Sequence, residues 1–124
     1  TAEEFVGYFI NLPLEKDIDE LRTALTPDFT YRNELIKNSP FEVDADSYIS
    51  GLINDWEYED TLDIKIIRIR KNKSKTKDIT SISAYYDEWL KDEFGIMGPF
   101  RRVNHFELTN VENEWFVKKM TVAN

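Results

Sequence analysis

The 124-residue chain contains no cysteine and one histidine, His105. The absence of cysteine excludes a disulfide scaffold, a thiolate metal site and a cysteine nucleophile. A single histidine without cysteine is also too little for a typical zinc site. The sequence further lacks a phosphate-binding loop, a dinucleotide fingerprint and a carboxylate cluster for calcium. We therefore expect neither a metal nor a cofactor.

Long hydrophobic runs are also missing, because no apolar segment approaches the length needed to span a membrane. The net charge of −8 argues against nucleic acid or an anionic membrane as the main partner. We expect a soluble protein without a nucleic-acid or membrane partner. The sequence leaves open whether that protein is cytoplasmic or secreted after removal of an upstream segment.

Positive charge is scarce except in residues 68–77, RIRKNKSKTK, which contain six Lys/Arg and no acid. The rest of the chain has 10 basic residues against 24 acidic ones. Two interpretations stay open. The segment is either a solvated hairpin tip whose lysines protect a sheet edge, or a patch that binds an anion or a partner.

The chain is rich in apolar residues, at 41%, and in aromatic residues, at 14%. This content and length predict one domain over residues 1–124 with a single core. Apolar residues recur at helical spacing in 3–12, where Pro13 interrupts the pattern, and in 17–25. Asp17 and the glutamate three residues later resemble a capping box.

A third helix is predicted to begin at Asp44 or Asp46. Its apolar face holds Tyr48, Ile49, Leu52, Ile53 and Trp56.

Alternating apolar residues predict a short strand at 29–32 and four long strands at 61–70, 78–89, 99–109 and 114–122. Residues 33–43 read as an irregular loop, and the adjacent Ile66 and Ile67 indicate a bulge. This order is typical of an α+β fold. We expect three N-terminal helices packed on a curved, mostly antiparallel sheet.

Three segments support a family resemblance. They are KDIDELRTALTPDFTYRN (16–33), FGIMGPF (94–100) and VNHFELTNVENEWFVKKMTV (103–122). With this element order they resemble the nuclear transport factor 2-like superfamily. That group includes ketosteroid isomerases, SnoaL-like polyketide cyclases, scytalone dehydratase and non-catalytic transport factors. The resemblance implies a cystatin-like cone, in which the concave sheet face and the helices enclose a pocket. The superfamily has many functions, so the resemblance implies no single activity.

The resemblance also aligns two asparagines with the acids of ketosteroid isomerases. Asn33 matches the general base that follows the first short strand, and Asn104 matches the acid that helps form the oxyanion hole. Tyr8 loosely matches the tyrosine of the first helix. An amide cannot take a proton from carbon, so we expect the isomerase mechanism to be absent.

Strand alternation places an arginine on the apolar face of 99–109. If Asn104 faces the pocket, the same face holds Phe100, Arg102, Phe106 and Leu108. His105 then faces outward. Two roles for Arg102 stay open: it binds a carboxylate or phosphate ligand, or it pairs with Asp87 or Glu88 on the neighbouring strand.

Two function classes follow. The first is a non-catalytic small-molecule-binding or protein-interaction module with a small anionic or apolar ligand. We expect it to be a homodimer through the outer sheet face, around Val103 and Trp115 or Phe116. The alternative is a small enzyme, such as a SnoaL-like cyclase, dehydratase or hydrolase, with Asp87 and Tyr31 as its acid–base groups. The predicted ligand-binding residues are Tyr8, Tyr31, Asn33, Phe100, Arg102, Asn104 and Phe106.

Overall fold

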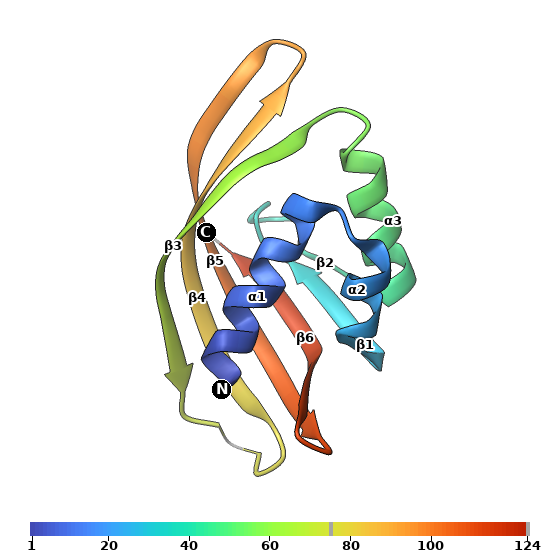
Figure 1. The fold of residues 1–124 in the computed structure, drawn as a ribbon, viewed down its shortest axis with the longest axis vertical. Helices are drawn as coiled ribbons and strands as arrows, with labels where there is room; N and C mark the ends of the chain where they lie inside the picture. The colour runs from blue at the N-terminus through green and yellow to red at the C-terminus, as the bar shows by residue number, and fades with distance from the viewer. Residues whose placement is uncertain (75, 124) are drawn as a thin grey trace.

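The computed structural model describes residues 1–74 and 76–123. Within these residues the helices are α1 (Ala2–Glu15), α2 (Ile18–Thr23) and α3 (Ala45–Asp55). The strands are β1 (Leu25–Asn33), β2 (Phe41–Asp44), β3 (Asp60–Asn72), β4 (Thr80–Asp92), β5 (Gly95–Val111) and β6 (Glu114–Ala123). Figure 1 shows their arrangement.

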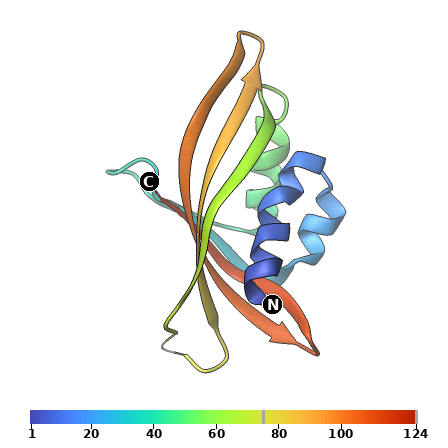
Figure 2. The ribbon, with the colours of Figure 1, turned by 60° about the vertical axis from the view of Figure 1, so that its left-hand side comes forward.

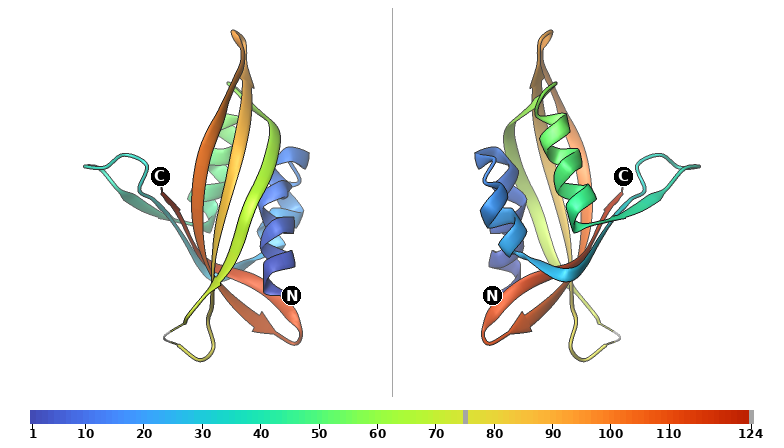
Figure 3. Two further views of the ribbon diagram at one scale, coloured as in Figure 1. Left: turned by 90° about the vertical axis from the view of Figure 1, so that its left-hand side faces the viewer. Right: turned by 90° about the vertical axis from the view of Figure 1, so that its right-hand side faces the viewer.

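The strands form one curved sheet in the order β2-β1-β6-β5-β4-β3. Neighbouring strands are antiparallel except for β1 and β6, which are parallel. The helices lie on one face of this sheet (Figures 2 and 3). The predicted α+β class and the mostly antiparallel sheet are confirmed. One detail needs correction: the three helices do not form a continuous N-terminal block, because β1 and β2 come between α2 and α3.

The helix starts follow the predicted capping chemistry. The Asp17 side chain accepts a hydrogen bond from the Glu20 backbone N–H at 3.0 Å. Asp44 accepts from the Ser47 N–H at 2.9 Å, so Asp44, rather than Asp46, caps α3. Pro13 does not end α1, which continues to Glu15. A proline in the last turn removes only one backbone donor near a terminus, so the helix can tolerate it.

The strand predictions are confirmed for the long strands β3 to β6 and are incomplete for β1 and β2 at the opposite edge of the sheet. The β3–β4 register shifts between Ile66 and Arg68, which confirms the predicted bulge. Residues 41–43, expected to be part of the loop 33–43, instead form β2 together with Asp44 and pair with β1. β1 is also longer than 29–32, because β2 and β6 bond its backbone groups from both sides.

The core lies between the helices and the inner face of β3–β6. Phe9 of α1 meets Phe106 of β5 edge to face, with ring centroids 5.8 Å apart. Along β5, Phe106 and Leu108 are buried while His105 and Glu107 are exposed, which confirms the predicted alternation. On α3, Ile53 departs from the predicted apolar face and is exposed.

The basic segment lies along the edge strand β3 and the turn that follows it. Its described cations are exposed, and none forms an ion pair within the part of the chain that the structure describes: Arg68, Arg70, Lys71, Lys73 and Lys77. Lys75 lies outside the described residues. A solvated edge and a partner patch both remain open.

Among the described helices, none has the length and apolar character required to cross a bilayer.

Candidate functional site

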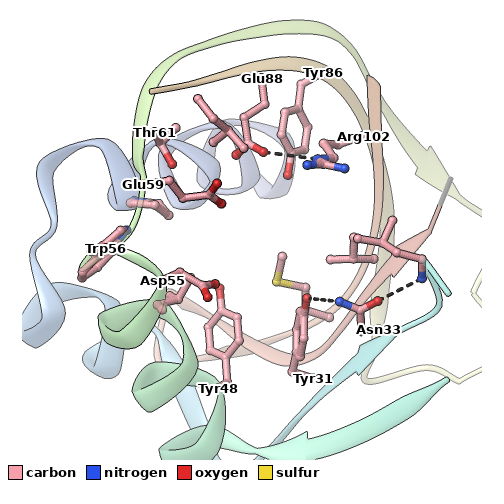
Figure 4. A pocket seen from close by; sticks show the side chains of 16 residues that line it. Tyr31, Asn33, Tyr48, Asp55, Trp56, Glu59, Thr61, Tyr86, Glu88 and Arg102 are labelled. Carbon is pink, nitrogen blue, oxygen red and sulfur yellow. Dashed lines mark hydrogen bonds and ion pairs between the residues drawn. The ribbon is translucent and has the colours of Figure 1, made fainter. Parts of the chain in front are cut away.

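A partly open cavity of about 250 Å³ lies between the helices and the concave sheet face (Figure 4). Tyr31 of β1, Tyr48 of α3 and Tyr86 of β4 contribute three hydroxyls to its wall. Apolar side chains fill much of the rest: Pro13, Leu35, Leu52, Leu90, Met120 and Val122. The predicted concave pocket is therefore present as a cavity.

The three tyrosine hydroxyls differ in their hydrogen bonds. The Tyr31 hydroxyl accepts from Asn33 Nδ2 at 3.1 Å, and the Tyr86 hydroxyl accepts from Asn104 Nδ2 at 2.9 Å. Tyr48 is only 7% exposed, yet its hydroxyl has no hydrogen-bond partner among the described residues. Burial raises the pKa of all three tyrosines, so each remains a protonated donor at neutral pH.

The two asparagines orient tyrosines. Asn33 lines the cavity, and its Oδ1 accepts from the Leu35 N–H at 2.9 Å. Asn104 is buried behind Tyr86, and its Oδ1 has no partner within the described part of the chain. Neither amide supplies a base, in keeping with the expected absence of isomerase chemistry.

Arg102 is paired within the protein. Its Nε donates to Glu88 Oε1 at 3.2 Å, and the guanidinium lies 5.2 Å from the centroid of the Phe100 ring. The Arg102 and Glu88 side chains are 22% and 19% exposed, so the pair is mostly withdrawn from water. Of the two internal partners that the sequence suggested, the structure selects Glu88.

Two further carboxylates face the cavity from the end of α3 and the connection to β3 (Figure 4). Neither Asp55 nor Glu59 has a hydrogen-bonded or ion-paired side chain within the described residues. Partial burial raises the pKa of Asp55. Burial is also the main cause that raises the pKa of Glu59; Asp55, Glu88 and Asp92 add to it, and Arg102 opposes it.

These raised pKa values link folding to pH. A carboxyl whose folded pKa is raised stabilises the fold most below its unfolded pKa. That contribution is lost as the pH rises through the folded pKa. The ionised forms of Asp55 and Glu59 are therefore disfavoured by their surroundings in the folded protein.

Four predicted ligand-binding residues lie outside the cavity wall: Asn104, described above, and Tyr8, Phe106 and Phe100. Tyr8 is on the exposed side of α1, where its hydroxyl donates to Glu20; this hydrogen bond is the main reason that the Tyr8 pKa is raised to about 12. Phe106 is completely buried in the core. Phe100 packs beneath Arg102 instead of lining the cavity.

The predicted catalytic residue Asp87 lies on the outer sheet face. In the β4–β5 register, Tyr86 is opposite Arg102, so Asp87 is opposite Arg101 on the other side of the sheet. Arg101 Nε donates to Asp87 Oδ1 at 2.6 Å. This ion pair and the outward orientation remove Asp87 from the cavity, whereas Tyr31 lines it as predicted.

Sequence reasoning did not identify Asp55 and Glu59 as site residues. A usable signal exists, because Tyr48, Leu52, Asp55 and Glu59 are spaced at i, i+4, i+7 and i+11, which continues one helical face. When the apolar residues of one helical face are followed by acidic residues at the end of the helix, the acidic residues indicate the opening of a pocket. Glu59 lies beyond the end of α3, where helical spacing no longer applies strictly.

The comparisons with known proteins support the fold. No family model and no curated protein matches the sequence. A beta subunit of benzoate 1,2-dioxygenase from Burkholderia mallei is similar in structure, with a TM-score of 0.78, 7% identity, and coverage of 98% of this chain and 87% of that chain. A Catenulispora acidiphila protein in complex with S-DNPA has a TM-score of 0.76 and 10% identity, covering 98% and 89%.

A similar solved structure also gives the fold its name. A nuclear transport factor 2-like protein of unknown function from Shewanella baltica has a TM-score of 0.63 and 19% identity, covering 96% of this chain and 86% of that one. These likenesses extend over nearly the whole chain, at identities that indicate shared fold rather than shared activity. The chain therefore has the nuclear transport factor 2-like fold, with no narrower subfamily indicated.

Proposed function

We propose that the protein is a non-catalytic module that binds a small molecule with one ring, or an apolar body of similar size, in this cavity. The observation that carries the proposal is the Tyr48 hydroxyl, which faces the cavity without a hydrogen-bond partner among the described residues, although Tyr48 as a whole is buried. The volume of about 250 Å³ exceeds the roughly 150 Å³ of an apolar cavity that binds benzene. The structural neighbour that holds S-DNPA gives a precedent for ligand binding on this fold.

The Tyr48 hydroxyl also indicates what the ligand offers. Its oxygen is not among the fully buried atoms that lack a partner in the described residues, so a ligand in the cavity can reach it. A ligand with a hydrogen-bonding group next to its ring would pair this hydroxyl, which can donate or accept, and would cover the apolar wall around Met120 and Val122. Tyr31 and Tyr48 stack with centroids 4.7 Å apart and give the cavity an aromatic side.

The hydroxyl is expected to contribute to binding without contributing to folding. Tyr48→Phe should leave the free energy of unfolding within about 0.5 kcal/mol of wild type in urea, because it breaks no hydrogen bond within the protein. Its affinity for 2-phenylethanol should fall about 3- to 10-fold by calorimetry, because one ligand hydrogen bond is lost.

Tyr86→Phe is the matched control. This change removes the acceptor of the buried Asn104 amide and should destabilise the protein by about 1–3 kcal/mol. Equal destabilisation by Tyr48→Phe would show that the Tyr48 hydroxyl has a structural partner, which removes the main support for the proposal. A wild-type protein that binds no single-ring compound at all would contradict the proposal itself.

The alternative enzyme function is favoured by one observation, the raised pKa of Glu59 and Asp55 beside a cavity. In that case the acid–base group would be Glu59 or Asp55, with a tyrosine hydroxyl as hydrogen-bond donor. Turnover of a bound compound that disappears in Glu59→Gln, while the compound still binds, would select the enzyme.

We also propose that the protein forms a homodimer through the outer face of the sheet. Val103 and Phe116 are half-buried in the monomer and offer apolar area, whereas Trp115 packs against the core and is not available. Sedimentation equilibrium at micromolar concentration should give twice the mass of 14.7 kDa. A monomer at that concentration would remove this interface without affecting the cavity.

A further inference from the structure

We propose that the ligand of this cavity is an organic cation, a protonated amine joined to a single aromatic ring. This inference rests on the proposed small-molecule site and names its ligand class. It differs from the anionic or apolar ligand that the sequence suggested, and it follows from the balance of charge around the cavity.

The cavity wall contains three carboxylates and one guanidinium. Glu88 forms an ion pair with the guanidinium of Arg102. Neither Asp55 nor Glu59 is ion-paired among the described residues, although Arg102 acts electrostatically on Glu59. An entering anion would meet these two carboxylates and would have to compete with Glu88 for Arg102, whereas an amine could pair with them.

Lys16, next to Trp56 of the cavity wall, does not supply a positive charge to the cavity. Lys16 forms an ion pair with Asp60, and its ammonium lies 5.8 Å from the centroid of the Trp56 ring. Lys16 is not part of the cavity wall. Its position nevertheless shows that a cation can lie over the ring of Trp56.

Aromatic and acidic side chains line the cavity together. Asp55 and Glu59 approach from α3 and its connection, while Tyr31 and Tyr86 approach from the sheet (Figure 4). A ring that packs between the tyrosines places a short aminoalkyl chain toward the carboxylates. Cations are also favoured over the electron-rich faces of aromatic rings.

The unpartnered Tyr48 hydroxyl is independent of the acids and points to the same ligand volume (Figure 4). Within the described residues, no three acidic or histidine side chains are grouped as ligands of a metal ion.

Three probes of nearly equal size test the charge: 2-phenylethylamine, 2-phenylethanol and phenylacetate. Calorimetry at pH 7 and low salt should show the amine binding about tenfold tighter than the alcohol, and phenylacetate weaker than both. Glu59→Gln should reduce the preference for the amine by about fivefold or more and leave the affinity for the alcohol nearly unchanged. Glu57→Gln is the matched control, because this exposed glutamate removes the same charge from outside the cavity wall and should keep the preference.

The outcomes separate this inference from the proposed function. If the alcohol binds as tightly as the amine, the proposal of a cationic ligand is wrong, but the proposed small-molecule site is still supported. Tightest binding of phenylacetate would overturn it in favour of an anion. Loss of the amine preference in both variants would also overturn it, because the effect would then come from overall charge. Binding of none of the three probes would contradict the site and the cation together.

Discussion

Replacing Arg102 with methionine is expected to lower the free energy of unfolding of the ligand-free protein by about 2–3 kcal/mol. The change leaves Glu88 without its guanidinium in a site that already holds Asp55 and Glu59. Breaking a fully buried ion pair costs about 3–5 kcal/mol. The smaller value is expected here because each side chain keeps about a fifth of its surface exposed.

A double mutant separates the pair from the shape of the site. Arg102→Met with Glu88→Gln removes both charges and should recover most of the lost stability in urea unfolding at pH 7. The introduced methionine side chain would still pack over the Phe100 ring, so the aromatic contact is partly kept. A single mutant as stable as wild type would show that Arg102 is not paired internally, and the anion-binding role would regain support.

Gly98→Ala should cost about 2–4 kcal/mol, because two penalties combine at one position. Gly98 has φ of +125°, a conformation that L-residues rarely adopt. A Cβ there would also lie 2.8 Å from the Glu88 carbonyl oxygen and 3.2 Å from Trp89 Cα. The β4–β5 register shifts between Glu88 and Leu90, so the irregularity brings the two backbones close together at a glycine.

Gly51→Ala provides the matched control for this prediction. Gly51 lies inside α3, and an added Cβ would meet no atom within 4 Å. Alanine favours a helix over glycine, so this variant should gain about 0.5–1 kcal/mol in the same urea measurement. If Gly98→Ala proved as stable as Gly51→Ala, the close approach beside Glu88 would be wrong.

Local chemistry made much of the fold predictable. Asp17 and Asp44 mark the starts of their helices, because each side chain caps the helix by accepting a hydrogen bond from the backbone N–H three residues later. The adjacent Ile66 and Ile67 indicate a bulge because apolar parity changes there. β2 was missed although Phe41 to Asp44 alternate apolar and polar residues, because four mostly exposed residues give too short a pattern to separate a strand from a loop.

The site was less predictable because it depends on register between strands. The sequence shows that Tyr85 and Tyr86 face opposite sides, but not which of them faces the cavity. Pairing of Tyr86 with Arg102 settles this and sends Asp87 outward. The helical spacing that continues from Tyr48 gives only a weak signal for Glu59, because Glu59 lies between α3 and β3.

The most direct test of the cavity as a ligand site uses the chain's two methionines, Met97 and Met120. Met120 lines the cavity, and Met97 does not. In protein with 13C-labelled methionine methyl groups, adding 2-phenylethylamine should shift the Met120 methyl resonance in a saturable manner and leave Met97 nearly unchanged. Met120→Leu and Met97→Leu assign the two signals. A saturable shift confined to Met97, or no shift of either methyl at concentrations where calorimetry detects binding, would place the ligand elsewhere and contradict the account.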